Sequence, residues 1–175
     1  MPLEIRRLRP EDDRSTFRSG NIELDRFFQR FAGQNQFRHH IGTTYVAIEG
    51  ELIHGFVTVV AAEVEIANLP ARRRKGLPGY PLPALRIARL AVHGPSQRRG
   101  IGSELLKAAF LLAREMAQKV GCLGVVVDAK ADAIAFYESY GFEHMEALAG
   151  ELGDRPAPSA MFLPLGSIMF DSGVD

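Results

Sequence analysis

Residues 89–106 read RLAVHGPSQRRGIGSELL, and no other stretch says as much about the fold. Its apolar residues 90–92 suit a strand, which a short loop with two glycines joins to the first turn of an amphipathic helix. Such a unit directs several backbone N–H groups to one point, where the positive end of the helix dipole lies. A diphosphate is the natural occupant of that point. Gly100 and Gly102 lack the Cβ atoms that would keep a phosphate away from the backbone.

Two common phosphate-binding loops do not match this stretch. It has no Gly-Lys-Ser/Thr ending, which excludes the NTP-binding loop with its phosphate-binding lysine. It is also not a G-x-G-x-x-G motif after an N-terminal strand with an acidic residue about 20 residues further on. What remains is Gln97-x-x-Gly100-x-Gly102, which favours a nucleotide-like cofactor such as coenzyme A. The alternative interpretation is a strand-to-helix turn with an exposed glutamine and two arginines.

Length and composition predict one soluble domain. The chain has 175 residues, of which 46% are hydrophobic and 24% charged, and its 21 basic and 21 acidic residues cancel. Affinity for a polyanion must therefore come from local clusters. A lone cysteine, Cys122, excludes an intramolecular disulfide and agrees with a reducing compartment. Without an apolar signal core or a membrane-length apolar run, we expect a cytoplasmic protein with one domain over residues 1–170 and a tail over 171–175.

The apolar pattern predicts strands and helices in mixed order. Expected strands cover residues 3–8, 43–49, 52–60, 61–67, 85–92, 123–127, 142–147 and 160–165. One expected helix begins after Asn21, which is its N-cap. Two further helices are expected over residues 101–120 and 131–140, and they end at Gly121 and Gly141. The Pro-, Gly- and Arg-rich segment 69–83 is expected to be a loop. An antiparallel meander followed by alternating strands and helices indicates an α+β (mixed α/β) fold.

A second informative stretch, AIAFYESYGF, covers residues 133–142. Taken with the Gln97–Gly102 loop, it resembles the GNAT superfamily of N-acyltransferases, whose patterns are Gln/Arg-x-x-Gly-x-Gly/Ala and Ala-x-x-Phe-Tyr-x-x-x-Gly-Phe. The resemblance extends over nearly the whole chain. It implies a central mixed, mostly antiparallel sheet with a splayed strand pair flanked by helices. It also implies an N-acetyltransferase that uses acetyl-CoA and no metal. The alternative for this second stretch is core aromatics followed by a helix stop.

The resemblance also implies the residues of the site. The backbone of Leu90, Ala91 and Val92 would lie along the pantetheine arm, with the Val92 N–H polarising the thioester carbonyl. The remaining cofactor-binding residues would be Gln97, Arg98, Arg99, Gly100, Ile101, Gly102, Ser103, Phe136 and Tyr137. Tyr137 is our candidate general acid for the leaving thiolate, because phenol and thiol reference pKa values of about 10 and about 8.5 make the transfer feasible. The alternative is that Tyr137 only packs in the core.

No general base stands out. Glu63 and Glu65 lie on a strand that could face the cleft, and His93 follows the cofactor strand, but a solvated or structural role fits each of them better. An acceptor α-amine with a pKa near 7.7–8.0 would need little help, since about a tenth of it is deprotonated at pH 7.

Within the superfamily, three segments resemble toxins that acetylate aminoacyl-tRNA. They are F-x-S-G-N-x-x-L-D-x-F-F with A-x-Q-x-Q over residues 17–36, TTYVA over 43–47, and LPGYPLPALRIARLAV over 77–92. Members of that branch use acetyl-CoA to acetylate the α-amine of charged tRNA, which blocks translation. The branch implies a homodimer and a ribbon-helix-helix antitoxin. One departure is His93, where the branch often has Asp.

A tRNA acceptor requires a basic surface beside the cleft. The predicted tRNA-binding residues are Arg72, Arg73, Arg74, Lys75, Arg86 and Arg89. The alternative is that these basic residues form a solvated loop that contacts no phosphate. Two further functions stay open: an N-acetyltransferase that acts on a protein amine or a small-molecule amine, and a non-catalytic module that keeps the fold for binding.

Overall fold

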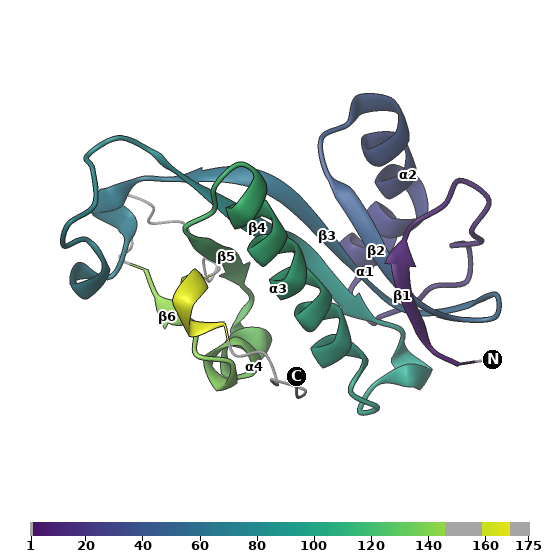
Figure 1. Ribbon diagram of the computed structural model, residues 1–175. Coiled ribbons are helices and arrows are strands. Elements are labelled where there is room, and N and C mark those ends of the chain that lie inside the picture. Colours follow the sequence, from purple (N-terminus) through teal and green to yellow (C-terminus); the bar gives the residue numbers. More distant parts are fainter. Residues whose placement is uncertain (1, 146–158, 169–175) are drawn as a thin grey trace, which may run out of the picture. The chain divides into compact units, whose positions relative to one another are not determined.

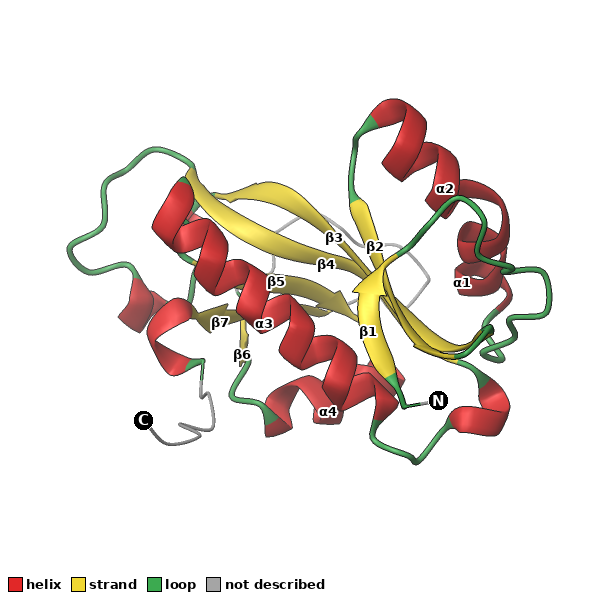
Figure 2. Cartoon of the chain, turned by 45° about the vertical axis from the view of Figure 1, so that its right-hand side comes forward, coloured by secondary structure: helices red, strands yellow, loops and turns green. Residues whose placement is uncertain are grey.

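The computed structural model describes residues 2–145 and 159–168, which fall into two compact units. Of the described residues, the first unit comprises 2–60 and 87–112, and the second comprises 61–86, 113–145 and 159–168. The strands form a seven-stranded sheet in the order β1-β2-β3-β4-β5-β7-β6 (Figures 1 and 2). Antiparallel pairs and interspersed helices confirm the α+β (mixed α/β) class. The single domain over 1–170 stays a prediction, and the tail over 171–175 lies outside the described residues.

The first unit begins with an antiparallel meander. Strands β1 (Glu4–Arg7), β2 (Thr43–Glu49) and β3 (Leu52–Val64) pair in sequence order. Gly50, at φ 60°, forms the turn of the β2–β3 hairpin. These strands confirm the expected ones over 3–8, 43–49 and 52–60. The separate strand predicted over 61–67 is wrong: β3 runs on to Val64, because the sequence has no turn residue where that break was expected.

The N-terminal helices are irregular. Helix α1 (Ile22–Arg26) begins at Asn21, whose Oδ1 accepts a hydrogen bond from the Leu24 N–H at 3.0 Å, so the predicted N-cap is confirmed. The chain continues through α2 (Ala32–Gln34), with π-helical turns over residues 27–31 and 35–39. Their apolar side packs into a core that contains Phe17, Phe28 and Phe56. In Figure 2, α1 and α2 lie beside β1 and β2.

Strand β4 (Leu82–Val92) leads into α3 (Ile101–Lys119). The segment before β4 has short 3-10 turns over 66–68 and 71–73. At the other end, Gly121, with φ 105°, follows the last residue of α3, as predicted. In the first unit, α3 packs tightly where β3 has Gly55: a Cβ there would lie 2.9 Å from Leu105 Cδ1 and 3.0 Å from the Ala91 carbonyl oxygen. The missing side chain therefore lets the helix approach the strands closely.

The second unit contains β5 (Gly124–Ala129), α4 (Ile134–Ser139), β6 (Glu143–His144) and β7 (Ser159–Pro164). Strand β5 pairs with β7 antiparallel, and Val126 opposite Phe162 forms part of the core. These elements confirm the expected ones, with the 131–140 helix split into a 3-10 turn and α4. Residues 146–147 of one predicted strand lie outside the described part.

Gly124 is a packing constraint in this unit. A Cβ there would lie 2.2 Å from the Leu163 carbonyl oxygen on the paired strand β7, so backbone would have to move. We expect Gly124→Ala to lower the free energy of unfolding by about 3 kcal/mol, or Tm by about 10 °C. Thermal unfolding followed by circular dichroism measures this. Gly166→Ala is the matched control, since a Cβ there meets nothing within 4 Å; equal Tm values for the two variants would contradict the explanation.

Candidate active site

The loop between β4 and α3 turns the chain through two residues with left-handed backbone. Arg98 has φ 67° and Gly100 has φ 77°. The Glu104 N–H donates to the Gly100 carbonyl at 3.1 Å, so the three N–H groups of residues 101–103 come before the first bond of the helix. A Cβ on Gly100 would meet nothing within 4 Å, which leaves open space in front of this turn. The geometry fits a diphosphate held by main-chain N–H groups at a helix N-terminus.

Backbone contacts anchor this loop to the N-terminal segment and to β3. The Gly94 N–H donates to the Arg18 carbonyl at 2.7 Å, and the Arg18 N–H donates to His93 Nδ1 at 3.1 Å. The His93 N–H donates to the His54 carbonyl on β3 at 2.8 Å. The loop is therefore held in shape by the protein itself.

Gln97, a predicted cofactor-binding residue, has its side-chain amide directed at the protein. Its Nε2 donates to the Ser19 carbonyl at 3.1 Å and to the Val92 carbonyl at 3.3 Å. Ser19 is fixed in turn by the buried Asp25, whose Oδ1 accepts from the Ser19 hydroxyl at 2.6 Å. The side chain of Gln97 thus holds the loop closed.

The other predicted cofactor residues of the first unit differ in exposure. Ala91 and Ile101 are buried, whereas Leu90, Val92, Gly102 and Ser103 are half-buried and Arg98, Arg99 and Gly100 are exposed. Arg99 pairs with Glu49 at 3.1 Å. Arg89, predicted to bind tRNA, places its guanidinium carbon 3.8 Å from the centroid of the Phe27 ring, and partial burial lowers its pKa.

Two polar residues that the sequence analysis did not single out lie at the base of the loop. His54 is 4% exposed and Ser96 is 2% exposed. His54 Nδ1 lies 2.5 Å from Ser96 Oγ, and its Nε2 lies 3.0 Å from Glu49 Oε1. The sequence does contain a signal for His54, because it is a histidine among the apolar residues 53–57 of a strand. A polar side chain buried there needs a hydrogen-bond partner elsewhere in the protein.

Tyr137 and Phe136 belong to the second unit. Tyr137 lies on α4, is 5% exposed, and makes edge-on ring contacts with Phe136 and Phe142 at 5.2 and 5.3 Å between centroids. Burial raises the pKa of Tyr137 to about 12. The phenol is therefore neutral and carries a proton over the whole physiological pH range.

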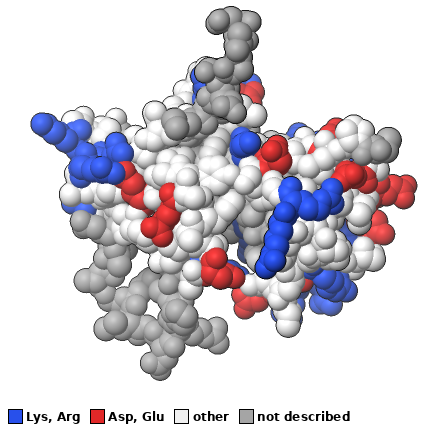
Figure 3. All heavy atoms as spheres, turned by 90° about the horizontal axis from the view of Figure 1, so that it is seen from below, with Lys and Arg blue, Asp and Glu red and all other residues white. Residues whose placement is uncertain are grey.

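The predicted tRNA-binding residues of the second unit are largely engaged within the protein. Arg72 and Arg73 both contact Glu143, and they hold the pKa of that carboxyl below its usual value. Arg86 pairs with Asp128 at 2.9 Å. The remaining two residues differ: Arg74 donates to backbone carbonyl oxygens, while Lys75 is exposed. On the face shown in Figure 3, Lys and Arg side chains form separate groups, with Asp or Glu side chains next to most of them.

The candidate general bases gain little support. Glu63 and Glu65 are exposed. His93 Nδ1 already accepts the Arg18 N–H, so a neutral His93 carries its proton on Nε2 and has no free basic nitrogen. Within residues 2–145 and 159–168, no group of three or more His, Cys, Asp or Glu side chains converges on a point where a metal could bind.

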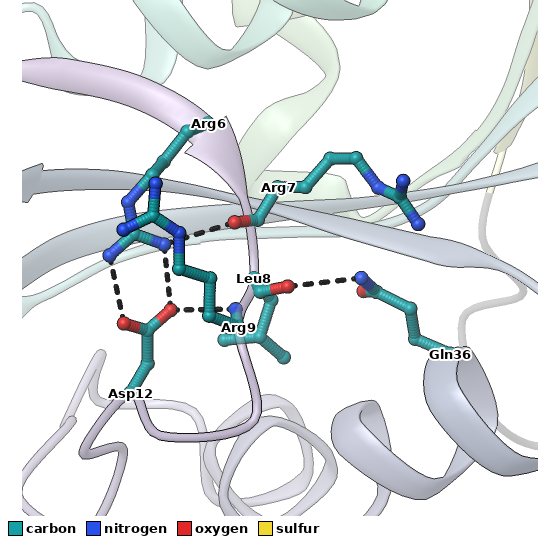
Figure 4. Close-up of polar contacts among 6 residues, drawn as sticks. All are labelled: Arg6, Arg7, Leu8, Arg9, Asp12 and Gln36. Atoms are coloured by element: carbon teal, nitrogen blue, oxygen red, sulfur yellow. Dashed lines mark hydrogen bonds and ion pairs between the residues drawn. The ribbon is translucent and has the colours of Figure 1, made fainter.

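A hollow of about 370 Å³ at the end of β1 is lined by residues 6–10, 36 and 37. Figure 4 shows the polar contacts around several of these residues. Arg6, one of its lining residues, is paired with both carboxylate oxygens of Asp12 at 2.8 Å. The buried side chain of Gln36 donates to the Leu8 carbonyl at 3.1 Å and accepts from the Thr44 N–H at 2.8 Å. Gln36 thus joins the end of β1 and β2 to the N-terminal helical segment, whereas the Arg6–Asp12 pair holds the turn after β1.

Comparison with known proteins identifies the class. The chain matches the family model described as "Acetyltransferase (GNAT) domain" over residues 40–144, which is more than half its length. The chain therefore belongs to the GNAT family of acetyltransferases. This confirms the predicted family and the predicted acyltransferase class. In the part of the chain that the structure describes, no helix has the length and apolar character of a membrane span.

Among its relatives are toxins. The chain is 32% identical over 139 residues to a "tRNA-acetylating toxin" of Mycobacterium tuberculosis (strain ATCC 25618 / H37Rv), a match that covers 79% of this chain and 82% of the relative. It is similar to the solved structure of AtaT complexed with acetyl-methionyl-tRNAfMet, with TM-score 0.83, 25% identity and coverage of 95% and 97%. It is also similar to AtaTR bound with AcCoA, with TM-score 0.75, 28% identity and coverage of 95% of both chains.

The raised pKa of Tyr137 predicts a loss of stability at alkaline pH. A neutral buried phenol contributes stability that is complete below the unfolded-state pKa of about 10 and is lost as pH rises through about 12. We expect Tm to fall more steeply between pH 9 and 11.5 in the wild type than in Tyr137→Phe. Differential scanning fluorimetry in matched buffers measures the difference. Tyr80→Phe is the control because Tyr80 is 65% exposed; parallel curves for the wild type and Tyr137→Phe would show that the Tyr137 pKa is not raised.

Proposed function

We propose that this protein transfers the acetyl group of acetyl-CoA to the α-amine of aminoacyl-tRNA and so blocks translation as the toxin of a toxin–antitoxin pair. The anchored loop with its open N–H groups at the start of α3 carries the proposal, because it fits the diphosphate of the donor. The family membership and the names of the relatives support the rest.

The donor brings the reactive bond, since acetyl-CoA supplies an activated thioester. The protein then has to position the thioester and polarise its carbonyl group. The backbone N–H groups of residues 101–103 and the turn at Gly100 would hold the diphosphate, and Arg98 is exposed beside them. The Val92 N–H, at the end of β4, would polarise the carbonyl that accepts negative charge.

Tyr137 would hold a proton for the departing thiolate. With a pKa of about 12, its hydroxyl is fully protonated at neutral pH, but complete transfer to a thiolate of pKa about 8.5 is uphill by about 3.5 pKa units. A hydrogen bond from the neutral hydroxyl to the developing thiolate needs no such transfer and still stabilises the charge. We therefore assign Tyr137 as the proton-bearing donor at the leaving group.

The ion pairs among the basic residues favour a second candidate function. Arg72, Arg73 and Arg86 already have carboxylate partners, and the chain has no net charge. A protein amine or a small-molecule amine would need no basic track, so an N-acetyltransferase with such an acceptor is the alternative. A tRNA acceptor would have to compete with Glu143 and Asp128 for these arginines.

The toxin proposal carries further expectations. A homodimer and a ribbon-helix-helix antitoxin are the proposed assembly states. A charged-tRNA acceptor implies that the enzyme works in the cytoplasm.

The direct experiment is incubation of the purified protein with radiolabelled acetyl-CoA and total aminoacyl-tRNA, followed by mapping of the label. We expect label on the α-amine of the aminoacyl group. In Tyr137→Phe, turnover should fall about 100-fold or more while acetyl-CoA binding by calorimetry stays unchanged, because only the hydrogen bond to the developing thiolate is lost. Near-normal turnover of this variant would reject the role of Tyr137. Transfer to a peptide or polyamine, with unlabelled tRNA, would establish the alternative function.

The Arg72–Arg73–Glu143 cluster offers a test of tRNA contact. Glu143→Gln removes the carboxylate charge that occupies two arginines, so we expect tighter tRNA binding by about threefold at 0.1 M salt and a steeper salt dependence. Filter binding over a salt series measures both. Glu115→Gln is the matched control, since Glu115 is paired with Lys119 on α3. Identical salt slopes for Glu143→Gln and the wild type would show that Arg72 and Arg73 do not contact phosphates.

A further inference from the structure

We infer that His54 is a positioning residue for the acetyl-CoA loop, acting through Ser96 and through the Glu49–Arg99 pair. The inference rests on the proposed use of this loop to hold the donor. His54 lies on β3, one strand away from the loop in sequence order, yet its imidazole reaches two points of the loop. It touches no reacting atom in this assignment.

The first contact is with the short 3-10 turn that opens the loop. Ser96, in the turn Gly94–Ser96, places Oγ 2.5 Å from His54 Nδ1, and both side chains are more than nine-tenths buried. Because both groups are buried, neither is solvated, and breaking this hydrogen bond leaves a buried polar atom without a partner. The hydrogen bond therefore fixes where the turn sits on β3.

The second contact runs through the β2–β3 hairpin. Glu49 Oε1 lies 3.0 Å from His54 Nε2 and 3.1 Å from a terminal nitrogen of Arg99. The His54–Glu49 contact is close but is not aligned as a hydrogen bond, so its effect is electrostatic. One carboxylate thus links the imidazole to the far end of the loop.

The charges around the ring select its tautomer. The Glu49 carboxylate favours a proton on Nε2, which leaves Nδ1 to accept the hydrogen bond from the Ser96 hydroxyl. In this arrangement Ser96 donates and His54 accepts, while the Nε2–H lies near Glu49 without a hydrogen bond to it. Of the two left-handed residues, Arg98 lies between these anchors and Gly100 directly follows the second one, and their conformation sets the direction of the open N–H groups.

Substitutions of His54 can separate the two contacts. Asparagine places its amide near the position of Nδ1 and so keeps a partner for Ser96, whereas glutamine reaches the position of Nε2 and loses that partner. We expect His54→Gln and Ser96→Ala to raise the Kd for acetyl-CoA about fivefold, the loss of one buried hydrogen bond, and His54→Asn less than about twofold. The kcat at saturating acetyl-CoA should change by less than about twofold in all three, because no reacting atom is touched.

A second measurement tests the loop without any donor. Trypsin under native conditions should cut after Arg98 and Arg99 about fivefold faster in His54→Gln and Ser96→Ala than in the wild type, normalised to cleavage after the exposed Lys130. Thr58→Val is the matched control, since it breaks the buried 2.7 Å hydroxyl pair with Thr44 elsewhere in the same unit. It should lower Tm and leave both the Kd and the loop cleavage unchanged.

The outcomes separate this inference from the proposed function. A wild type that binds no acetyl-CoA sinks the proposed function, while faster loop cleavage in the two variants still supports the role of His54 in shaping the loop. Unchanged Kd and cleavage in Ser96→Ala, or equal effects of His54→Asn and His54→Gln, overturn the inference. So does a Kd increase in Thr58→Val that matches the one in Ser96→Ala, because a general loss of stability would then explain both.

Discussion

The left-handed backbone at Arg98 and Gly100 is the constraint on which the rest of the site depends. It turns the chain from the end of β4 into the start of α3 within a few residues, and so leaves the first N–H groups of the helix facing outward. Glycine adopts this conformation freely, but for Arg98 it costs roughly 1–2 kcal/mol. Such a residue persists only where its neighbours over-determine it. The hydrogen bonds from the N-terminal segment, from Gln97 and from Ser96 supply that constraint.

The N-terminal segment therefore serves the site as well as the core. Phe17 packs edge-on against Phe28 at 4.8 Å, and Phe28 stacks on Phe56 of β3 at 4.3 Å between ring centroids. Directly after Phe17, the backbone of residues 18–19 contacts the loop at three points. Packing of the aromatic cluster thus fixes the position of residues 18–19, which hold the loop. Gly55 lets α3 approach β3 closely, and this brings the start of the helix near the strand that carries Phe56.

Sequence reasoning predicted the parts of this arrangement that have local causes. The positions of glycine residues and the apolar periodicity predicted the ends of α3 and the cap at Asn21, because each is decided within a few residues. The continuation of β3 to Val64 was missed, since strand length depends on a partner strand and not on the strand itself. The contacts of Ser96 with His54 and of Arg73 with Glu143 join residues 42 and 70 positions apart, and no local pattern encodes them. The roles of the predicted site residues remain predictions.

The acceptor question turns on protonation more than on shape. The three candidate bases of the sequence offer no clear support for base catalysis: His93 has its basic nitrogen occupied, and Glu63 and Glu65 are exposed carboxylates. Without a base, the rate follows the fraction of acceptor amine that is already neutral. At pH 7 that fraction is about a tenth for an α-amine and about 0.04% for a lysine-type amine, a ratio of about 250. An acetyltransferase that worked without a general base would therefore favour α-amines over lysine side chains and polyamines on protonation alone. Under the proposed function, the basic residues would have to distinguish an α-amine on tRNA from one on a peptide, and phosphate contacts by exposed cations such as Lys75 would provide that distinction.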